Sequence, residues 1–437
     1  MGYTAQVLDA APAEVQTGLR RLAHTFSHFA FLETGRALGA FCEPLDRYSW
    51  LAAGGCKRLH RMHEADAEGW TAFCAAWRAK PTWLFGVLGY ELKNVLEPTA
   101  LSRHAKAEED TPDLEFFEPE WVVTCQGNEL TLHFAQDTQN AAQWWYGMQQ
   151  KRTSDVALPF DKKGPTLRAA WQASDYEAHA QTLLDHCYRG DLYEVNLCAR
   201  WKAKAVVDPM GVYRALQERT DAPMAGVYHS PSGWLLSGSP ERYLTIRKEG
   251  DKRRVYSQPI KGTASIELPA NALRQSEKEC AENTMIVDLV RNDLSRVAIK
   301  GSVTVPRYLE VRTLPTVHHM VSTVCADLTP EADWLSAVQA SFPMGSMTGA
   351  PKIRAMQRID EEETARRGWY SGALGYVQPN GECDFNVVIR SLIHHGQTWH
   401  GWAGSALTVL ADPKAEWEEL QLKMKAPIAA LENPWEA

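Results

Sequence analysis

A pair of acidic residues near the C-terminus has the spacing of a cation site. The sequence predicts a helix from Asp412 and Pro413, a side-chain cap followed by proline at the first helical position. Glu416, Glu419 and Lys423 then fall on one face of that helix. Two carboxylates one turn apart can hold a hard cation such as Mg²⁺. The alternative is a solvated face on which Glu419 and Lys423 form a surface ion pair.

A second acidic segment, residues 282–293, is also predicted to be helical. Its middle, MIVDLV at 285–290, is apolar enough to be buried on most sides. Glu282, Asp288, Arg291 and Asp293 would then lose hydration unless they are paired or bound to a metal. An internal salt-bridge network around Arg291 accounts for the Asp and Arg members without any metal.

Lys261 could act as a nucleophile. It lies between an apolar run and a glycine, in PIKGT at 259–263, and Glu241 precedes it in SPER at 239–242. In a partly dry pocket, desolvation or a nearby cation lowers the pKa of a lysine and frees its amine. The alternative is a lysine in an ordinary turn, which the following glycine favours.

Residues 342–352, FPMGSMTGAPK, form a glycine-bearing loop before a predicted helix. The free amides at a helix N-terminus can bind an anion. The sequence contains no P-loop, no G-x-G-x-x-G after a strand, no G-x-S-x-G and no H-E-x-x-H. Nucleotide-binding, serine-hydrolase and zinc-protease functions are therefore disfavoured.

The elements that must position these residues are mixed. SDYE at 174–177 is predicted to be a capping box that starts a helix ending at Gly190, and a helix with Pro351 at its first position is predicted to run to Arg367. Strand-like runs occupy 120–124, 129–133, 233–237, 253–260, 371–377, 386–394 and 397–409. Because strands and helices do not alternate strictly, we expect an α+β fold rather than a doubly wound parallel sheet. Residues 151–165 are the best candidate linker.

Composition excludes several classes of protein. The 437 residues carry 46 Lys and Arg against 54 Asp and Glu, a net charge of −8, which disfavours a general nucleic-acid binder. The nine cysteines include no C-x-x-C pair, so neither a disulfide framework nor a zinc site is indicated. The longest apolar runs are too short to span a bilayer, and no signal peptide is evident. We expect a protein of the reducing cytoplasm.

Taken together and in order, these motifs resemble those of the chorismate-utilising enzymes, and within that family its aminodeoxychorismate synthase component I branch. The resemblance is strong over residues 170–425 and weak before 160, where only FLET at 31–34 and residues 84–91 match. The motifs are GDLYEVN at 190–196, SPER at 239–242, PIKGT at 259–263, AEN through RND at 281–293, VHHMVST at 317–323, GSMTGAPK at 345–352 and EWEE at 416–419 with Lys423.

The resemblance implies a fold of two large, mainly antiparallel sheets packed as a sandwich, with helices outside. It implies an N-terminal subdomain at 1–160 intertwined with a chorismate-binding catalytic region at 165–430. It implies Mg²⁺ bound by Glu282 and Glu419 with Glu416 beside them, and Glu241 as the general acid. His319 is implied as a further catalytic residue, and the implied substrate-binding residues are Arg390, Lys423, Tyr370, Gly404, Ser346 and Thr263.

Lys261 separates the branches of this family. Anthranilate and isochorismate synthases typically carry alanine there, whereas aminodeoxychorismate synthases with lysine use it as a covalent nucleophile. The amine would add at C2 of chorismate and expel the C4 hydroxyl, and ammonia would then add at C4 and expel the lysine. The implied product is 4-amino-4-deoxychorismate, a precursor of 4-aminobenzoate and folate. No amidotransferase-type cysteine motif is evident, so a separate glutamine amidotransferase would supply the ammonia.

Two rival functions stay open. The first is an anthranilate synthase component I, which Lys261 disfavours. The second is a non-catalytic chorismate-binding subunit, which the retained acids and lysine disfavour. The sequence departs from the family at Ser405 and Ala406, where the family usually has glycines, so we expect an effect on pocket width there. Met344 replaces a residue that is frequently small in the family. The tryptophan-binding motif of the N-terminal half is poorly matched, and feedback control is not predicted.

Overall fold

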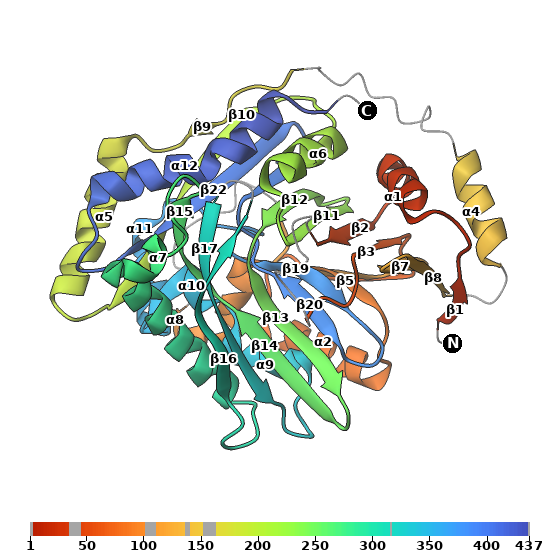
Figure 1. The fold of residues 1–437 in the computed structure, drawn as a ribbon, viewed down its shortest axis with the longest axis horizontal. Coiled ribbons are helices and arrows are strands. Elements are labelled where there is room, and N and C mark those ends of the chain that lie inside the picture. Colours follow the sequence, from red (N-terminus) through yellow and green to blue (C-terminus); the bar gives the residue numbers. More distant parts are fainter. Residues whose placement is uncertain are drawn as a thin grey trace.

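Two antiparallel β-sheets that share a hydrophobic core form the frame of the molecule (Figure 1). The structure is a computed structural model that describes residues 3–34, 45–100, 111–135, 140–151, 163–314 and 317–435. Every strand pairing in these ranges is antiparallel. The α+β, two-sheet architecture expected from the sequence is confirmed.

The first sheet contains strands from the whole length of the chain. In spatial order they are β1 (Thr4–Val7), β8 (Glu129–Phe134), β7 (Trp121–Gln126), β3 (Trp50–Gly54), β2 (Phe29–Glu33), β11 (Met224–Ser230), β12 (Gly233–Ser239), β21 (Ser391–His395), β22 (Thr398–Leu407), β10 (Glu194–Lys204) and β18 (Gly349–Ala350), with β9 (Arg168–Ala169) also paired to β10.

The second sheet is built in the same way. Its strands, in spatial order, are β15 (Ile260–Ser265), β17 (Val317–Asp327), β14 (Lys252–Gln258), β13 (Arg242–Glu249), β20 (Cys383–Asn386), β19 (Ala373–Val377), β5 (Leu84–Leu88), β6 (Leu114–Glu118) and β4 (Arg58–Met62), with β16 (Thr304–Thr313) also paired to β17.

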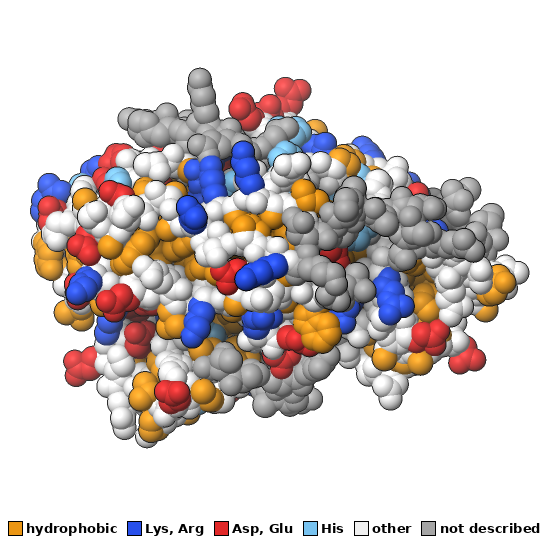
Figure 2. Space-filling model, turned by 90° about the horizontal axis from the view of Figure 1, so that it is seen from above, with side chains coloured by type: hydrophobic (Ala, Val, Ile, Leu, Met, Phe, Trp, Pro, Cys, Tyr) orange, Lys and Arg blue, Asp and Glu red, His pale blue; other side chains and the backbone are white. Residues whose placement is uncertain are grey.

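Helices cover the outer surfaces, and α5, α6 and α12 lie along one side of the molecule in Figure 1. The helices are α1 (Pro12–Arg21), α2 (Ala67–Ala79), α3 (Lys93–Leu96), α4 (Ala141–Gln150), α5 (Ala173–Tyr188), α6 (Pro209–Thr220), α7 (Ala272–Gln275), α8 (Glu277–Ser295), α9 (Trp334–Ser341), α10 (Gly345–Thr348), α11 (Lys352–Glu362) and α12 (Pro413–Glu432). On the face shown in Figure 2, basic side chains are interspersed with acidic and apolar ones.

Strand β2 shows how the first sheet is buried on both faces. Phe29 and Phe31 pack into the core beneath α1, whereas Ala30 and Leu32 belong to the core shared with the second sheet. Successive side chains of a strand point to opposite faces, so a run of apolar residues serves both cores. Strand β2 pairs with β11, and β5 pairs with β19. Residues before 152 and after 162 thus share both sheets, and most of the linker predicted at 151–165 lies outside the described residues.

Helix boundaries differ from the prediction at several points. Helix α8 extends beyond the predicted 282–293 at both ends, and Pro351 is the N-cap of α11 rather than its first helical residue. Helix α5 begins two residues early: Gln172 is its N-cap, and Asp175, rather than Glu177, accepts the hydrogen bond from the cap amide at 2.8 Å. Helix α11 ends at Glu362 and does not reach Arg367. The chain leaves the helix there because the buried Glu363 carboxylate accepts hydrogen bonds from the backbone amide of Cys198 and from the Arg367 guanidinium. The predicted start of α12, with Asp412 as N-cap, is confirmed.

Two of the predicted strands are each divided. The run at 253–260 becomes the end of β14 and the first residue of β15, and the run at 386–394 becomes the end of β20 and the start of β21. Arg390, between the latter pair, has a left-handed backbone with φ of 52°. The bend directs the chain from the second sheet into the first, next to the site described below.

Candidate active site

A pocket of about 880 Å³ brings all the predicted site residues together. Its wall comes from both sheets and from α8, α10 and α12. The lining residues are Asn196, Pro240, Glu241, Ile260, Lys261, Gly262, Thr263, Lys278, Glu279, Glu282, His319, Ser346, Met347, Tyr370, Ile389, Arg390, Trp402, Ala403, Gly404, Ala406, Glu416, Glu419 and Lys423. Segments that are more than 200 residues apart in sequence thus meet in one cavity.

A β-bulge directs Lys261 into this pocket. Ile260 pairs with Val321 and Thr263 pairs with His319, so β15 has one more residue than β17 between these positions. Gly262 has a φ of +89°, a conformation that glycine adopts without strain. The lysine therefore lies in a bulge of the edge strand β15, and the alternative of an ordinary turn is wrong.

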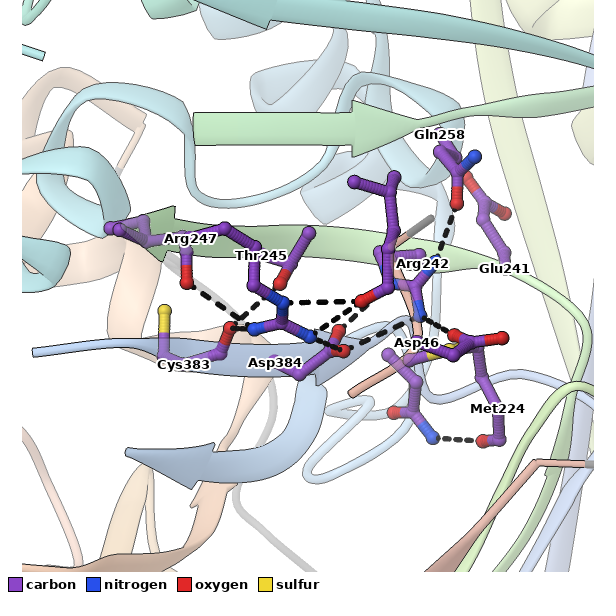
Figure 3. A network of polar contacts seen from close by, with 12 residues as sticks. Asp46, Met224, Glu241, Arg242, Thr245, Arg247, Gln258, Cys383 and Asp384 are labelled. Atoms are coloured by element: carbon purple, nitrogen blue, oxygen red, sulfur yellow. Dashed lines mark hydrogen bonds and ion pairs between the residues drawn. The ribbon is translucent and has the colours of Figure 1, made fainter. Parts of the chain in front are cut away.

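Glu241 is held by the residue that follows it. The buried Arg242 guanidinium donates to Asp384 at 2.8 Å and to Gln258 at 2.6 Å, and it pairs with Asp46 (Figure 3). Arg247 donates to the second oxygen of Asp384 at 2.7 Å. This network fixes the start of β13, and Glu241 is its immediate neighbour on the pocket side.

Removing the shared carboxylate of this network should cost stability. We expect Asp384→Asn to lower the free energy of unfolding by about 3 kcal/mol, because two buried guanidinium groups lose their common counter-ion. Guanidinium chloride denaturation measures the change. Asp288→Asn is the control, since Asp288 pairs with Arg291 on the exposed face of α8 and its loss should leave the unfolding free energy unchanged. Equal effects of the two substitutions would contradict the role assigned to the network.

Glu241 is suited to hold a proton near neutral pH. Burial raises its pKa to about 7, although the Ser346 hydroxyl and the Lys261 ammonium favour the charged form. Ser346 Oγ donates to Glu241 Oε1 at 2.7 Å. A carboxylic acid with this pKa can donate a proton to a leaving group at physiological pH.

The ammonium of Lys261 donates a hydrogen bond to Oε1 of Glu194, the first residue of β10, at 2.5 Å. Burial by itself lowers the pKa of Lys261, but nearby carboxylates outweigh burial and raise it above its ordinary value. These carboxylates belong to Glu194, Glu282 and Glu241. The prediction that desolvation leaves this amine neutral is therefore wrong, because the pocket pairs the lysine with an acid.

Carboxylates from α8 and α12 form one wall of the pocket. Oε1 of Glu282 is buried and accepts no hydrogen bond from any described residue, and burial raises the pKa of Glu282 to about 8. Lys278 Nζ lies 2.8 Å from Glu416 Oε1 and 3.9 Å from Glu282 Oε1. Burial favours the neutral form of Glu419, yet the Lys423 ammonium, 2.6 Å away, lowers its pKa.

The donor atoms of this wall suit a hard divalent cation. Carboxylate oxygens are the ligands that Mg²⁺ prefers, and the unpartnered oxygen of Glu282 is available for one. Within the described ranges, however, no group of three or more His, Cys, Asp or Glu side chains is already gathered as a metal-binding cluster. The ammonium of Lys278 occupies the space between Glu282 and Glu416 instead.

Two cations face the acidic wall. Arg390 lines the pocket, and no described residue forms a hydrogen bond or ion pair with its guanidinium. Lys423 donates to the Gly404 carbonyl at 2.8 Å in addition to pairing with Glu419. A Cβ at Gly404 would lie 2.6 Å from the side chains of Asn196 and Cys198, so glycine is needed there. Arg390 is thus free to bind a substrate carboxylate.

The remaining predicted residues are uncharged. Burial, followed by the Arg390 cation, lowers the pKa of His319 to about 3, so its imidazole is neutral. His319 Nδ1 lies 3.1 Å from Thr263 Oγ1. The Tyr370 ring stacks on Trp402 at 5.7 Å, and burial raises its pKa well above the ordinary value. These groups shape and polarise the pocket without adding charge.

Some members of the predicted acidic helix lie outside the site. Asp288 and Arg291 pair on the exposed face of α8, so the predicted buried network around Arg291 is wrong. Asp293 is buried and pairs with Lys352 at 2.6 Å. The first residue of α11, Lys352, therefore binds Asp293. Of residues 342–352, only Ser346 and Met347 line the pocket.

Of the three residues that depart from the family pattern, Ser405 and Met344 do not line the pocket. Ser405 is buried and its hydroxyl lies 2.5 Å from the Tyr176 hydroxyl on α5. Met344 lines a smaller cavity on the other side of Glu241. Ala406 does face the pocket, so of the three residues it is the one that can change the width of the pocket.

Sequence reasoning missed several residues of the site. Lys278 and Glu279 precede Glu282 by one helical turn, and that spacing could have revealed them. Glu194 lies within the GDLYEVN motif, but nothing in the sequence connects it with Lys261, which is 67 residues away.

In the part of the chain that the structure describes, no helix has the length and apolar character needed to cross a bilayer.

Comparison with known proteins agrees with the geometry. Residues 43–429 match the sequence pattern of the family described as chorismate binding enzyme. A curated relative from Klebsiella aerogenes, aminodeoxychorismate synthase component 1, is 35% identical over 365 residues, which cover 80% of this chain and 77% of the relative. The aminodeoxychorismate synthase of Streptomyces pristinaespiralis is 43% identical over 260 residues, but the aligned part is only 36% of that longer protein.

The fold is similar to that of solved structures. The crystal structure of anthranilate synthase component I from Streptococcus pneumoniae superposes with a TM-score of 0.74 at 25% identity, covering 90% of this chain and 95% of that one. The family pattern covers most of both sheets and every residue that lines the pocket. The chain therefore belongs to the chorismate binding enzyme family.

Proposed function

We propose that this protein catalyses the Mg²⁺-dependent amination of chorismate by ammonia to 4-amino-4-deoxychorismate, through a covalent adduct on Lys261. The observation that carries the proposal is the position of Lys261, which a bulge directs into the same pocket as a carboxyl group with a pKa of about 7. The relatives named aminodeoxychorismate synthase support the same reaction.

The charges of the pocket suit a substrate with two carboxylates. The pocket wall holds five carboxyl groups, but four basic side chains lie among them and can face the substrate carboxylates. Arg390 is the cation best able to bind a carboxylate, because its guanidinium is not engaged by any described residue and offers two parallel donors. Tyr370 and the backbone near Gly404 would fix the orientation of the ring.

The reaction then divides one difficult substitution into two steps. The Lys261 amine attacks C2 of chorismate, both ring double bonds shift by one position, and the C4 hydroxyl leaves as water with the proton of Glu241. Ammonia attacks C4, both double bonds shift back and the lysine amine leaves. Glu241 recovers its proton from the new ammonium group on C4, so the enzyme is restored.

Glu282 and Glu419 are the carboxylates that we propose for Mg²⁺, with Glu416 beside them once Lys278 moves away. When bound, the ion would neutralise a substrate carboxylate and draw electrons from the ring. The unpartnered oxygen of Glu282 supports this assignment.

The cellular setting follows from the same chemistry. Relatives named component 1 support a second component, and we propose a glutamine amidotransferase that supplies the ammonia. The product would feed 4-aminobenzoate and folate synthesis. We propose the cytoplasm as the compartment, because the eight described cysteines are all free thiols.

Product analysis tests the proposal. Chorismate, Mg²⁺ and an ammonium salt should give 4-amino-4-deoxychorismate, identified by mass and by its conversion to 4-aminobenzoate with the matching lyase. Omitting Mg²⁺ in the presence of EDTA should abolish turnover, and adding Mg²⁺ should restore it. Anthranilate as the main product would favour the rival function, which the Thermus thermophilus anthranilate synthase component 1, 33% identical over 366 residues, also represents. Absence of turnover even with an amidotransferase would favour a non-catalytic subunit.

A further inference from the structure

We propose that Glu194 is the base that removes a proton from the Lys261 ammonium and returns it at the end of the cycle. The inference rests on the proposed function, since it concerns the activation of that nucleophile. Glu194 is fully buried, and its carboxylate lies 2.5 Å from Lys261 Nζ. It is not among the residues that line the pocket, so it reaches the reaction through the lysine alone.

The backbone of Glu194 is locked in position. It is the first residue of β10 and pairs with Ala350 of β18. The preceding Tyr193 amide donates to the Ala350 carbonyl at 2.8 Å. A Cβ on Gly349 would lie 2.1 Å from the Glu194 carbonyl oxygen, so the two strands approach closely. The carboxylate therefore has little freedom to leave the lysine when a substrate enters.

The second oxygen of Glu194 is available to hold a proton. Oε2 is buried and accepts no hydrogen bond from any described residue. A buried carboxylate oxygen without a donor costs stability, and protonation of this oxygen would remove that cost. The Glu194 carboxylate lies directly beside Lys261 Nζ. A proton acceptor is needed there because an ammonium has no electron pair for attack.

Proton transfer to Glu194 completes the balance of the reaction. One N–H bond of the Lys261 ammonium breaks, the proton goes to the Glu194 carboxylate, and the electron pair left on Nζ forms the bond to C2. When ammonia later expels the lysine, its neutral amine takes the proton back from Glu194. Glu194 and Glu241 thus serve separate protons, one for the nucleophile and one for the leaving hydroxyl.

Several ionisable groups face Lys261 and bear on any pH profile. They are Glu194 from β10, Glu241 next to β13, Lys278, Glu279 and Glu282 from α8, His319 from β17, Arg390 before β21, and Glu416, Glu419 and Lys423 from α12. Of these, only Glu194 has an oxygen within hydrogen-bonding distance of Nζ. A change in the pH dependence of kcat on substitution of Glu194 therefore reports on the contact between Glu194 and Lys261.

The test compares wild type with Glu194→Gln, which keeps the size of the side chain and removes the base. At a fixed concentration of free ammonia near pH 7, we expect kcat to fall at least 100-fold, in line with the usual contribution of a general base. The KM for chorismate should change less than about threefold, because Glu194 does not line the pocket. The ratio of variant to wild-type kcat should rise with pH, since hydroxide takes over the proton.

Two further variants distinguish loss of the base from a folding defect. Glu194→Asp retains a carboxylate and should keep at least tenfold more activity than Glu194→Gln, with both variants compared to wild type in thermal unfolding. The double variant Glu194→Gln/Lys261→Ala should be no less active than Lys261→Ala, because base and nucleophile act as one unit.

The outcomes separate this inference from the function on which it rests. Glu194→Gln with kcat within threefold of wild type, or a ratio that does not change with pH, overturns the base while amination stands. Glu194→Asp as inactive as Glu194→Gln also overturns it. A wild-type protein that forms no 4-amino-4-deoxychorismate overturns both proposals.

Discussion

Replacing Lys261 with alanine is expected to lower the formation of 4-amino-4-deoxychorismate by about 10³-fold or more, because the variant lacks the nucleophile of the first step. Neither the pocket residues that bind chorismate nor Glu241 is altered. Initial rates with chorismate, Mg²⁺ and ammonium measure the effect. Lys425→Ala, an exposed lysine on α12, is the control and should keep the wild-type rate.

This substitution also has a predictable structural cost. Lys261→Ala leaves the Glu194 carboxylate buried without its partner, which should lower the unfolding free energy by about 3–5 kcal/mol. Adding Glu194→Gln should recover much of that loss, because the unpaired charge is removed. Lys261→Arg keeps a cation but offers no nucleophile, since a guanidinium stays protonated. Comparing these variants separates loss of chemistry from loss of fold.

The covalent step has its own readout. With chorismate and Mg²⁺ but no ammonia, intact-protein mass spectrometry should detect an adduct on Lys261 in wild type and none in Lys261→Arg. A Lys261→Ala variant that kept full amination activity would refute the covalent route while leaving the overall reaction in place.

Replacing Glu241 with glutamine is expected to lower kcat by about 10²–10⁴-fold, because the C4 hydroxyl then leaves without a proton donor. The pH dependence gives a second readout. A general acid is active only when protonated, and the pKa of Glu241 is about 7, so wild-type kcat should fall as pH rises above that value. In Glu241→Gln this descending limb should be absent. A limb that persists in the variant would assign it to another group.

Ser346→Ala provides a matched control for that profile. The Ser346 hydroxyl donates to the Glu241 carboxylate and stabilises its charged form, which lowers the pKa. Without this bond the pKa should rise, and the descending limb should move to higher pH. A limb that moves to lower pH, or does not move, would contradict the assignment of Glu241 as the acid.

Much of the fold was predictable because local chemistry fixes it. Asp412 followed by Pro413 predicted the start of α12, and strand-like runs predicted fewer than half of the strands, among them β7, β8, β12, β19 and β22. The misplaced boundaries have physical causes outside the local sequence. Helix α11 ends early because a buried Glu363 bonds to β10 and to Arg367, and a sequence window around the helix contains no sign of β10.

The set of site residues was predicted from the order of the motifs, and all of these residues line one pocket. Their charge states were not predictable. Lys261 is surrounded by carboxylates that come from β10, α8 and the start of β13, so its pKa is raised and not lowered. The predicted buried network around Arg291 failed for a similar reason, because the helix turns that residue and Asp288 to the solvent.

By itself, the sequence determined the types of chemical group available, their order along the chain and the mainly antiparallel α+β character of the fold, since propensity, capping and periodicity act over a few residues. Only the tertiary structure decided which groups meet. The contact between Glu194 and Lys261 and the unpartnered oxygen of Glu282 depend on strand register, a bulge and burial. Charge interactions act through space in a low-dielectric pocket, and distance along the chain does not set their strength.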